Sequence, residues 1–197
     1  MRSAVKITVL MVILSIFTTC RKGPDDPLVS LRTRKARLAG EWRLQSGNMR
    51  VTYVDIGNFA RMNVAYKVNG GRYEGTETGL QGSFSGTYVL SLKIEKDGTF
   101  SLHEVFDTNE LNVAGIWDFA LASKNVKRKE EFFLLIEKVT KGSTNNYQLF
   151  NWGSTNMRYM IRELRHKKLV LTVSSRVLID PDELNIDYSG DLVFTQD

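Results

Sequence analysis

Hydrophobic side chains recur at every second position through most of the chain beyond residue 40. Val64, for example, stands between Asn63 and Ala65, and the same period runs through segments 60–68, 88–95, 113–120 and 169–174. Successive side chains of a β-strand point to opposite faces, so this period predicts strands with one face on a core and the other in water. No long stretch in this region has the spacing of a helix. We therefore expect an all-β domain.

Turn-forming residues separate the alternating segments. Asn69-Gly70-Gly71 and Asp97-Gly98 tolerate the positive φ angles that tight hairpins require. Arg165-His166-Lys167-Lys168 supplies a third tight reversal, and residues 141–146 form a longer polar loop. The expected strands span about 41–46, 49–56, 60–68, 86–95, 99–106, 113–121, 131–139, 147–152, 157–164, 169–175 and 185–195.

Many short strands joined by hairpins form either a barrel or a sandwich. Sequential hairpins favour an antiparallel up-and-down barrel of eight or more strands, because closure removes the exposed strand edges. A β-sandwich is the alternative. The spacing of Leu28, Leu31, Lys35 and Leu38 predicts a short helix at about 28–38, before the barrel.

The first nineteen residues have the layout of a secretory signal peptide. Arg2 and Lys6 precede an apolar run from Ile7 to Phe17, in which only Thr8 and Ser15 are polar. This run is shorter than the roughly 20 apolar residues that a lasting membrane span needs. We expect residues 1–19 to be removed from the mature protein.

Cys20, the only cysteine of the chain, follows Phe17-Thr18-Thr19. This arrangement resembles the lipobox of bacterial lipoproteins, and ordinary cleavage after small residues is the alternative. The resemblance implies that Cys20 becomes the first mature residue and carries acyl chains such as palmitate, which anchor it in a membrane. Because Arg21 rather than Asp follows the cysteine, the resemblance also implies an outer-membrane lipoprotein of the bacterial cell envelope, facing the periplasm or the surface.

Residues 20–37 connect this anchor to the barrel domain, 38–197. Two of the three prolines lie within 21–27, which indicates a tether. The basic run 32–37 could contact anionic lipid head groups near the anchor, and a solvated helix face is the alternative. Removing Arg2 and Lys6 with the signal lowers the net charge from +5 to +3, so we expect no nucleic-acid partner.

Gly40-Glu41-Trp42 places a Gly-x-Trp motif where the expected helix meets the first strand. This arrangement resembles the opening motif of lipocalins, and the segment 157–173 resembles parts of bacterial lipocalin-like lipoproteins. The resemblance covers about residues 38–196. It implies an up-and-down barrel in which Trp42 packs across the closed end.

Residues suited to catalysis or metal binding are sparse. The chain has two histidines, His103 and His166, and neither stands near a nucleophile motif. The segment 82–86 lacks the spacing and the strand-to-helix setting of a nucleophile elbow, and the acidic residues of 180–183 do not complete a calcium loop. We expect no enzymatic activity, no metal and no cofactor.

Binding is the function that remains. Amphipathic aromatic side chains on the expected strands suit a mostly apolar pocket, although they can equally fill a packed core. The leading expectation is a membrane-anchored lipoprotein that binds a small, mostly apolar ligand inside the barrel. One alternative is a filled barrel that serves as an accessory subunit of an envelope complex, through its outer face or the loops 69–86 and 141–156. Another is a glycan-binding sandwich with exposed tryptophans. The candidate binding residues are Tyr53, Tyr66, Tyr88, Trp117, Trp152 and Tyr159.

Overall fold

The computed structural model describes residues 32–55, 60–78, 82–123, 129–143, 150, 155–180 and 184–196. These residues form one short helix and ten strands. In chain order the elements are α2 (Arg34–Leu38), β1 (Gly40–Asp55), β2 (Ala60–Asn69), β3 (Arg72–Glu77), β4 (Ser83–Ile94), β5 (Thr99–Phe106), β6 (Asn109–Phe119), β7 (Glu131–Lys141), β8 (Asn156–Leu164), β9 (Lys168–Asp180) and β10 (Leu184–Thr195).

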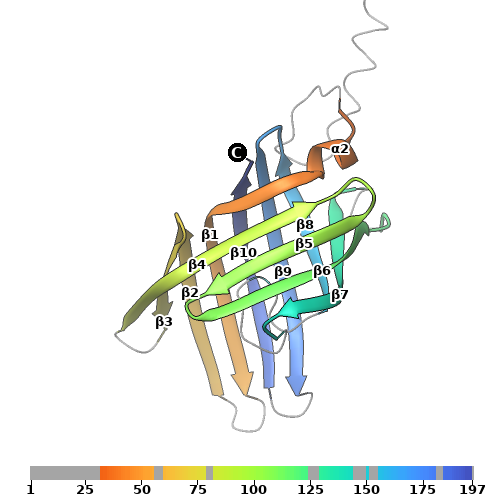
Figure 1. The fold of residues 1–197 in the computed structure, drawn as a ribbon. Coiled ribbons are helices and arrows are strands. Elements are labelled where there is room, and N and C mark those ends of the chain that lie inside the picture. The colour runs from red at the N-terminus through yellow and green to blue at the C-terminus, as the bar shows by residue number, and fades with distance from the viewer. Residues whose placement is uncertain are drawn as a thin grey trace, which may run out of the picture.

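The ten strands close into one antiparallel up-and-down barrel (Figure 1). Each strand pairs with the next in the chain, and β10 returns to pair with β1. The predicted all-β barrel of eight or more strands is therefore confirmed, as is the short preceding helix, of which Arg34–Leu38 is described. The sandwich alternative is wrong, because a single closed sheet leaves no second sheet to pack against.

The two ends of the barrel are bounded by different numbers of strands. Gly40–Arg43 of β1 pairs directly with β4, whereas β1 from Ser46 onward pairs with β2. The β2–β3 hairpin enters this fork, where Gly70 and Gly71 turn with φ of 55° and 82°. At the level of Gly40 the wall lacks β2 and β3, so eight of the ten strands surround it. We call this the narrow end and the opposite end the wide end.

β1 is one continuous strand where the sequence predicted two, at 41–46 and 49–56. Its pairing with β10 shifts register between Leu44 and Ser46. An extra residue at such a bulge moves the inward positions by one, from Trp42 and Leu44 to Gly47 and Met49. The break in the period of two is a bulge inside one strand.

β3 was not predicted. Its buried positions are Tyr73 and Gly75, so half of its inward face has no side chain to produce a hydrophobic signal. The Phe84 ring of β4 lies where a Cβ of Gly75 would point. The predicted strand at 147–152 lies outside the described residues except for Phe150, which lies in a turn.

The described inward-facing side chains of the barrel are mostly buried and pack on one another. An enclosed hollow large enough for a ligand would leave accessible surface on the side chains around it. Tyr88 and Tyr159 are each 1% exposed, and Trp117 is 3% exposed. The largest of the fully buried side chains are Trp42, Tyr88, Tyr159, Phe132, Phe150 and Phe194.

Helix α2 lies at the narrow end of the barrel, where it contacts β8 (Figure 1). Two of its arginines are buried and bind main-chain carbonyls of β8. Arg37 donates to the Leu164 oxygen at 2.6 Å, and Arg34 donates to the Ile161 oxygen at 3.4 Å. These two residues of the basic run therefore serve to attach the helix, and the prediction of a fully solvated or lipid-facing run is wrong for them.

Trp42 joins α2 to the barrel from inside. Its side chain is fully buried, and its indole Nε1 donates to the Leu38 oxygen at 2.7 Å. Lys35 of the helix places its ammonium 5.5 Å from the centre of the Trp117 ring. The narrow end is therefore closed by α2 above Trp42 and Trp117.

Candidate functional site

The predicted binding residues that the structure describes belong to the inner face of the barrel. Tyr66, Tyr88, Trp117 and Tyr159 are buried in the core, and Tyr53 is half-buried against it. Trp117 lies near the narrow end beneath Lys35, away from the rest of the set. Trp152 and Cys20 lie outside the described residues. The proposed stacking role of an exposed Trp117 does not fit its burial.

A buried glutamate that the sequence analysis did not single out stands among these aromatic residues. Glu104 of β5 is inaccessible to solvent, and its Oε1 accepts hydrogen bonds from the Tyr88 hydroxyl at 2.6 Å and the Phe150 main-chain nitrogen at 2.8 Å. Its position has the same parity as buried Leu102. This shared parity could have predicted that Glu104 points into the core, where a buried acid needs hydrogen-bond donors.

Phe150 extends this network across the barrel. Its ring stacks on that of Tyr159 with a centroid separation of 4.5 Å, and its carbonyl accepts from the Tyr159 hydroxyl at 2.9 Å. Phe150 thus fills the interior beside β8 while its nitrogen is held by Glu104 of β5. The Tyr88 and Tyr159 hydroxyls, the Phe150 main chain and Glu104 Oε1 are hydrogen-bonded within this network and lie away from water.

Burial controls the acid–base behaviour of the two tyrosines. It raises the pKa of Tyr88 well above the ordinary value, and the nearby Glu104 raises it further. Burial likewise raises the pKa of Tyr159, with smaller contributions from Tyr188 and Glu104. Both hydroxyls are therefore protonated donors at neutral pH, which suits a structural role.

Part of the inner face does reach solvent, on β4 near the wide end. Phe84 is 41% exposed and packs edge-on against Tyr66, with ring centroids 5.9 Å apart. Tyr73 and Phe106 stack beside them at 4.6 Å. These four rings form an aromatic cluster that is closed toward the core and open at Phe84.

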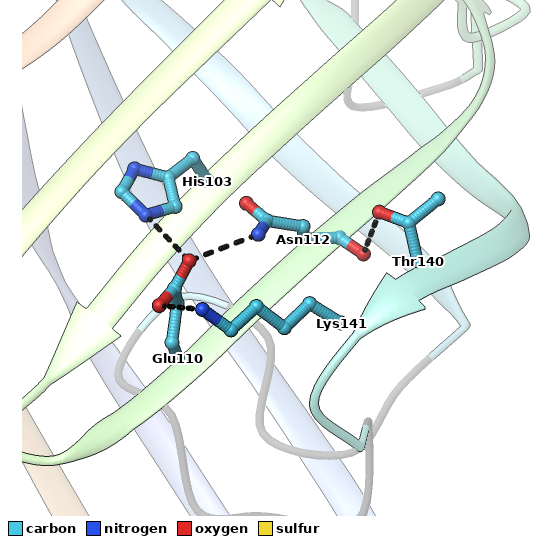
Figure 2. Close-up of polar contacts among 5 residues, drawn as sticks. All are labelled: His103, Glu110, Asn112, Thr140 and Lys141. Atoms are coloured by element: carbon cyan, nitrogen blue, oxygen red, sulfur yellow. Dashed lines mark hydrogen bonds and ion pairs between the residues drawn. The ribbon is translucent and has the colours of Figure 1, made fainter.

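On the outer wall, polar side chains of β5, β6 and β7 gather around Glu110 (Figure 2). Its carboxylate lies 2.5 Å from the Lys141 ammonium and 3.5 Å from His103 Nε2, and it accepts from the Asn112 side-chain amide at 3.0 Å. The Thr140 hydroxyl donates to the Asn112 carbonyl at 3.1 Å. Lys141, followed by Asn112, lowers the pKa of Glu110.

This cluster borders a surface groove of about 510 Å³. Ser91 lies opposite His103 across the β4–β5 pair, which is the one arrangement here that resembles a nucleophile beside a base. No hydrogen bond joins the two side chains, and His103 is directed at Glu110 instead. The cluster is therefore an exposed ion-pair network, of the kind that contributes little to stability.

Two further grooves lie on the outer wall and meet at Arg50. Their volumes are about 440 and 430 Å³, and both include Arg50 and Ser189. The residues opposite Arg50 on the adjacent strands, Ala65 and Ser189, are small. Among the described residues Arg50 has no hydrogen-bond or ion-pair partner, whereas nearby Arg176 binds Asp187 at 2.5 Å. The other lining side chains include Asn48, Thr52, Lys67, Glu74, Thr76, Ser174 and Ser175.

Within the described parts of the chain, no three side chains of His, Cys, Asp or Glu are grouped so that they could hold a metal ion. The same parts contain no helix with the length and apolar character needed to cross a membrane. No protein-family model, curated protein or solved structure matches the chain. Its function must therefore be argued from its own geometry.

Proposed function

We propose that the chain is a non-enzymatic lipoprotein of the bacterial outer membrane, anchored through acylated Cys20, which binds an envelope protein with the outer wall of its barrel. The observation that supports this proposal is the close packing of the described side chains inside the barrel. Tyr88, Tyr159 and Phe150 are buried at the level where a ligand would sit, and they are hydrogen-bonded or stacked on one another. A lipocalin-like barrel of this kind is a scaffold, with its recognition surface outside.

The grooves that meet at Arg50 are the best surface for such binding. A guanidinium carries five donors in a fixed plane and binds carboxylates through paired hydrogen bonds. Arg50 has small neighbours on both sides and no partner among the described residues, so a bound group would not first have to displace an internal acid. The hydroxyl and amide lining suits a polar, acidic segment of a partner.

A small, mostly apolar ligand in the barrel is the second candidate. The partly exposed Phe84 ring favours this candidate, because it packs edge-on against the buried rings of Tyr66 and Tyr73. Such a ligand would enter from the wide end beside half-buried Tyr53. Native mass spectrometry of protein taken from its own envelope would detect it as an added mass.

Anchoring is tested by Cys20→Ala. We expect this variant to lose labelling by tritiated palmitate and to leave the membrane fraction. Unchanged labelling would remove the anchor from the proposal.

The binding surface is tested by a photo-crosslinking amino acid at position 189, beside Arg50, in cells of the native host. We expect a crosslinked protein partner, and we expect Arg50→Ala to reduce the crosslink strongly. Arg72→Ala, an exposed arginine outside both grooves, is the matched control, and a crosslinker at Lys138 of β7 reports the outer wall elsewhere. Absence of a crosslink at 189 together with an added small mass would favour the interior site. Absence of both would contradict both candidates.

A further inference from the structure

The tether reaches the barrel at its narrow end. Twelve positions separate Cys20 from Arg32, the first described residue, which directly precedes Thr33 and α2. Twelve residues span at most about 40 Å when fully extended. An acyl chain on Cys20 would therefore hold the narrow end near the bilayer, and this end has the surface chemistry that a bilayer favours.

Cations from separate parts of the chain come together at this end, and all of them except half-buried Lys129 are exposed. Arg32 precedes the helix, Lys96 lies in the β4–β5 turn, Lys167 lies in the β8–β9 turn, and Lys129 precedes β7. Leu121, just after β6, is 91% exposed, more than any other large hydrophobic residue that the structure describes. We call these five residues the narrow-end surface.

The acids of the same connections cancel only part of this charge. Glu95 is bound by Lys93 at 2.9 Å, whereas Asp97, which accepts from the nitrogen and hydroxyl of Thr99, and Glu130 keep their negative charge at this end. The side chains of Lys96 and Lys167 have no hydrogen-bond or ion-pair partner among the described residues. The cations of the turns are therefore available to an external anion.

The described residues of the wide end have no such excess. Glu77, Asp107 and Glu110 stand there with Arg61 and Lys141, and Lys141 is already bound to Glu110. Among the described residues, the excess of positive charge therefore lies at the narrow end, where the tether joins the barrel.

We propose that the narrow-end surface docks onto an anionic lipid surface, with its lysines and Arg32 at the head groups and Leu121 inserted among them. The inference rests on the proposed Cys20 anchor, and it adds an orientation. Each basic residue near an anionic membrane strengthens binding by about fivefold, and a leucine adds apolar burial. Docking by this end directs the wide end away from the bilayer and leaves the sides of the barrel, including Arg50, open to partners.

The test uses the processed full chain reconstituted into vesicles of phosphatidylethanolamine with about one third phosphatidylglycerol, and into neutral phosphatidylcholine vesicles. A fluorophore is attached to Leu121→Cys or, as the matched wide-end position, to exposed Thr108→Cys. Mass spectrometry verifies one dye per chain, since an acylated Cys20 has no free thiol. Flotation reports anchoring, and energy transfer to a head-group acceptor reports orientation.

We expect the protein to float with both vesicle types, and we expect transfer from position 121 to exceed that from position 108 on anionic vesicles. The excess of energy transfer from position 121 should fall in high salt, which shortens the screening length. It should also fall in the double variant Lys96→Glu/Lys167→Glu. The wide-end reversal Arg61→Glu should leave it unchanged. These reversals lie on exposed positions and preserve the core.

The outcomes separate the two proposals. If the protein floats but energy transfer is equal at positions 121 and 108, the docking proposal is overturned and the anchor is left intact. The same holds if transfer from position 121 is greater but does not depend on salt or lipid charge. Flotation on anionic vesicles alone, lost in high salt, supports the docking and contradicts the anchor. Failure to float on either vesicle contradicts both.

Discussion

The Tyr88 hydroxyl donates a 2.6 Å hydrogen bond to the Glu104 carboxylate inside the barrel, where neither side chain is more than 1% exposed. The bond joins β4 to β5, and through the Phe150 nitrogen it reaches the segment that precedes β8. An acid at this depth is tolerated only because donors surround it. The interior is thus organised by a polar pair as well as by apolar packing.

Tyr88→Phe should lower the free energy of unfolding by about 1.5–3 kcal/mol, the range for a hydrogen bond to a charged group, because Glu104 stays buried and loses a donor. Tyr73→Phe is the matched control, since its hydroxyl donates to a carboxylate at 2.7 Å but that acceptor, Asp107, is exposed and can bind water. Urea denaturation of both variants measures the difference. Equal losses would mean that the depth of Glu104 is unimportant.

Stability should fall at alkaline pH because of the buried tyrosines. Burial holds the pKa of Tyr88 and Tyr159 well above 10, so the folded protein keeps protons that the unfolded chain releases. The stabilisation that these two tyrosines provide is therefore complete below about pH 10, and it is lost as the pH rises from there toward their pKa in the folded protein. The expected loss is about 1.4 kcal/mol per pH unit for each of the two tyrosines.

Urea denaturation between pH 8 and pH 11 measures this slope, and absorbance at 295 nm follows tyrosinate formation. Tyr88→Phe should make the slope shallower, since one of the buried hydroxyls with a raised pKa is gone. A slope that is flat up to pH 11 would show that these hydroxyls titrate in the folded protein.

The class of fold could be predicted because alternation and turn residues are local. Pairs such as Leu90 and Leu92, with Asp97-Gly98 beyond them, identify a strand and its hairpin without knowledge of distant residues. The bulge in β1 and the strand β3 could not be found in this way. A bulge shows itself only in the register with β10, and Gly75 depends on the Phe84 ring of another strand for its packing.

The candidate site was harder to predict for a related reason. Periodicity places Tyr88 and Tyr159 on the inner face, but it does not reveal whether that face encloses a cavity or packs on itself. The packing of the inner face depends on Phe150, which lies in a turn, and on Glu104. Because Glu104 is charged, a hydrophobic pattern does not identify its position as inward. The Arg50 side chain likewise has no partner among the described residues, and the small residues opposite it, Ala65 and Ser189, belong to two neighbouring strands.

Arg37→Met should lower the free energy of unfolding by about 1.5–3 kcal/mol. The change keeps much of the side-chain volume and removes the 2.6 Å bond to the Leu164 oxygen, leaving a carbonyl under α2 without that donor. Arg72→Met, at an exposed position without a hydrogen-bond or ion-pair partner among the described residues, should change stability little. Urea denaturation compares the two variants, and similar small effects would show that the Arg37 bond adds little to the attachment of α2.

Trp42→Ala should be the most damaging of these substitutions, at about 3–5 kcal/mol, because it removes a large, fully buried side chain and leaves a cavity beneath α2. Trp42→Phe separates packing from hydrogen bonding, since it keeps an aromatic ring and loses the bond from the indole nitrogen to the Leu38 oxygen. We expect it to cost less than the alanine variant. Urea denaturation followed by far-ultraviolet circular dichroism measures both variants without relying on the fluorescence of the deleted tryptophan. A loss of only a few tenths of a kcal/mol for Trp42→Ala would mean that the narrow end closes without this residue, in contradiction to its complete burial.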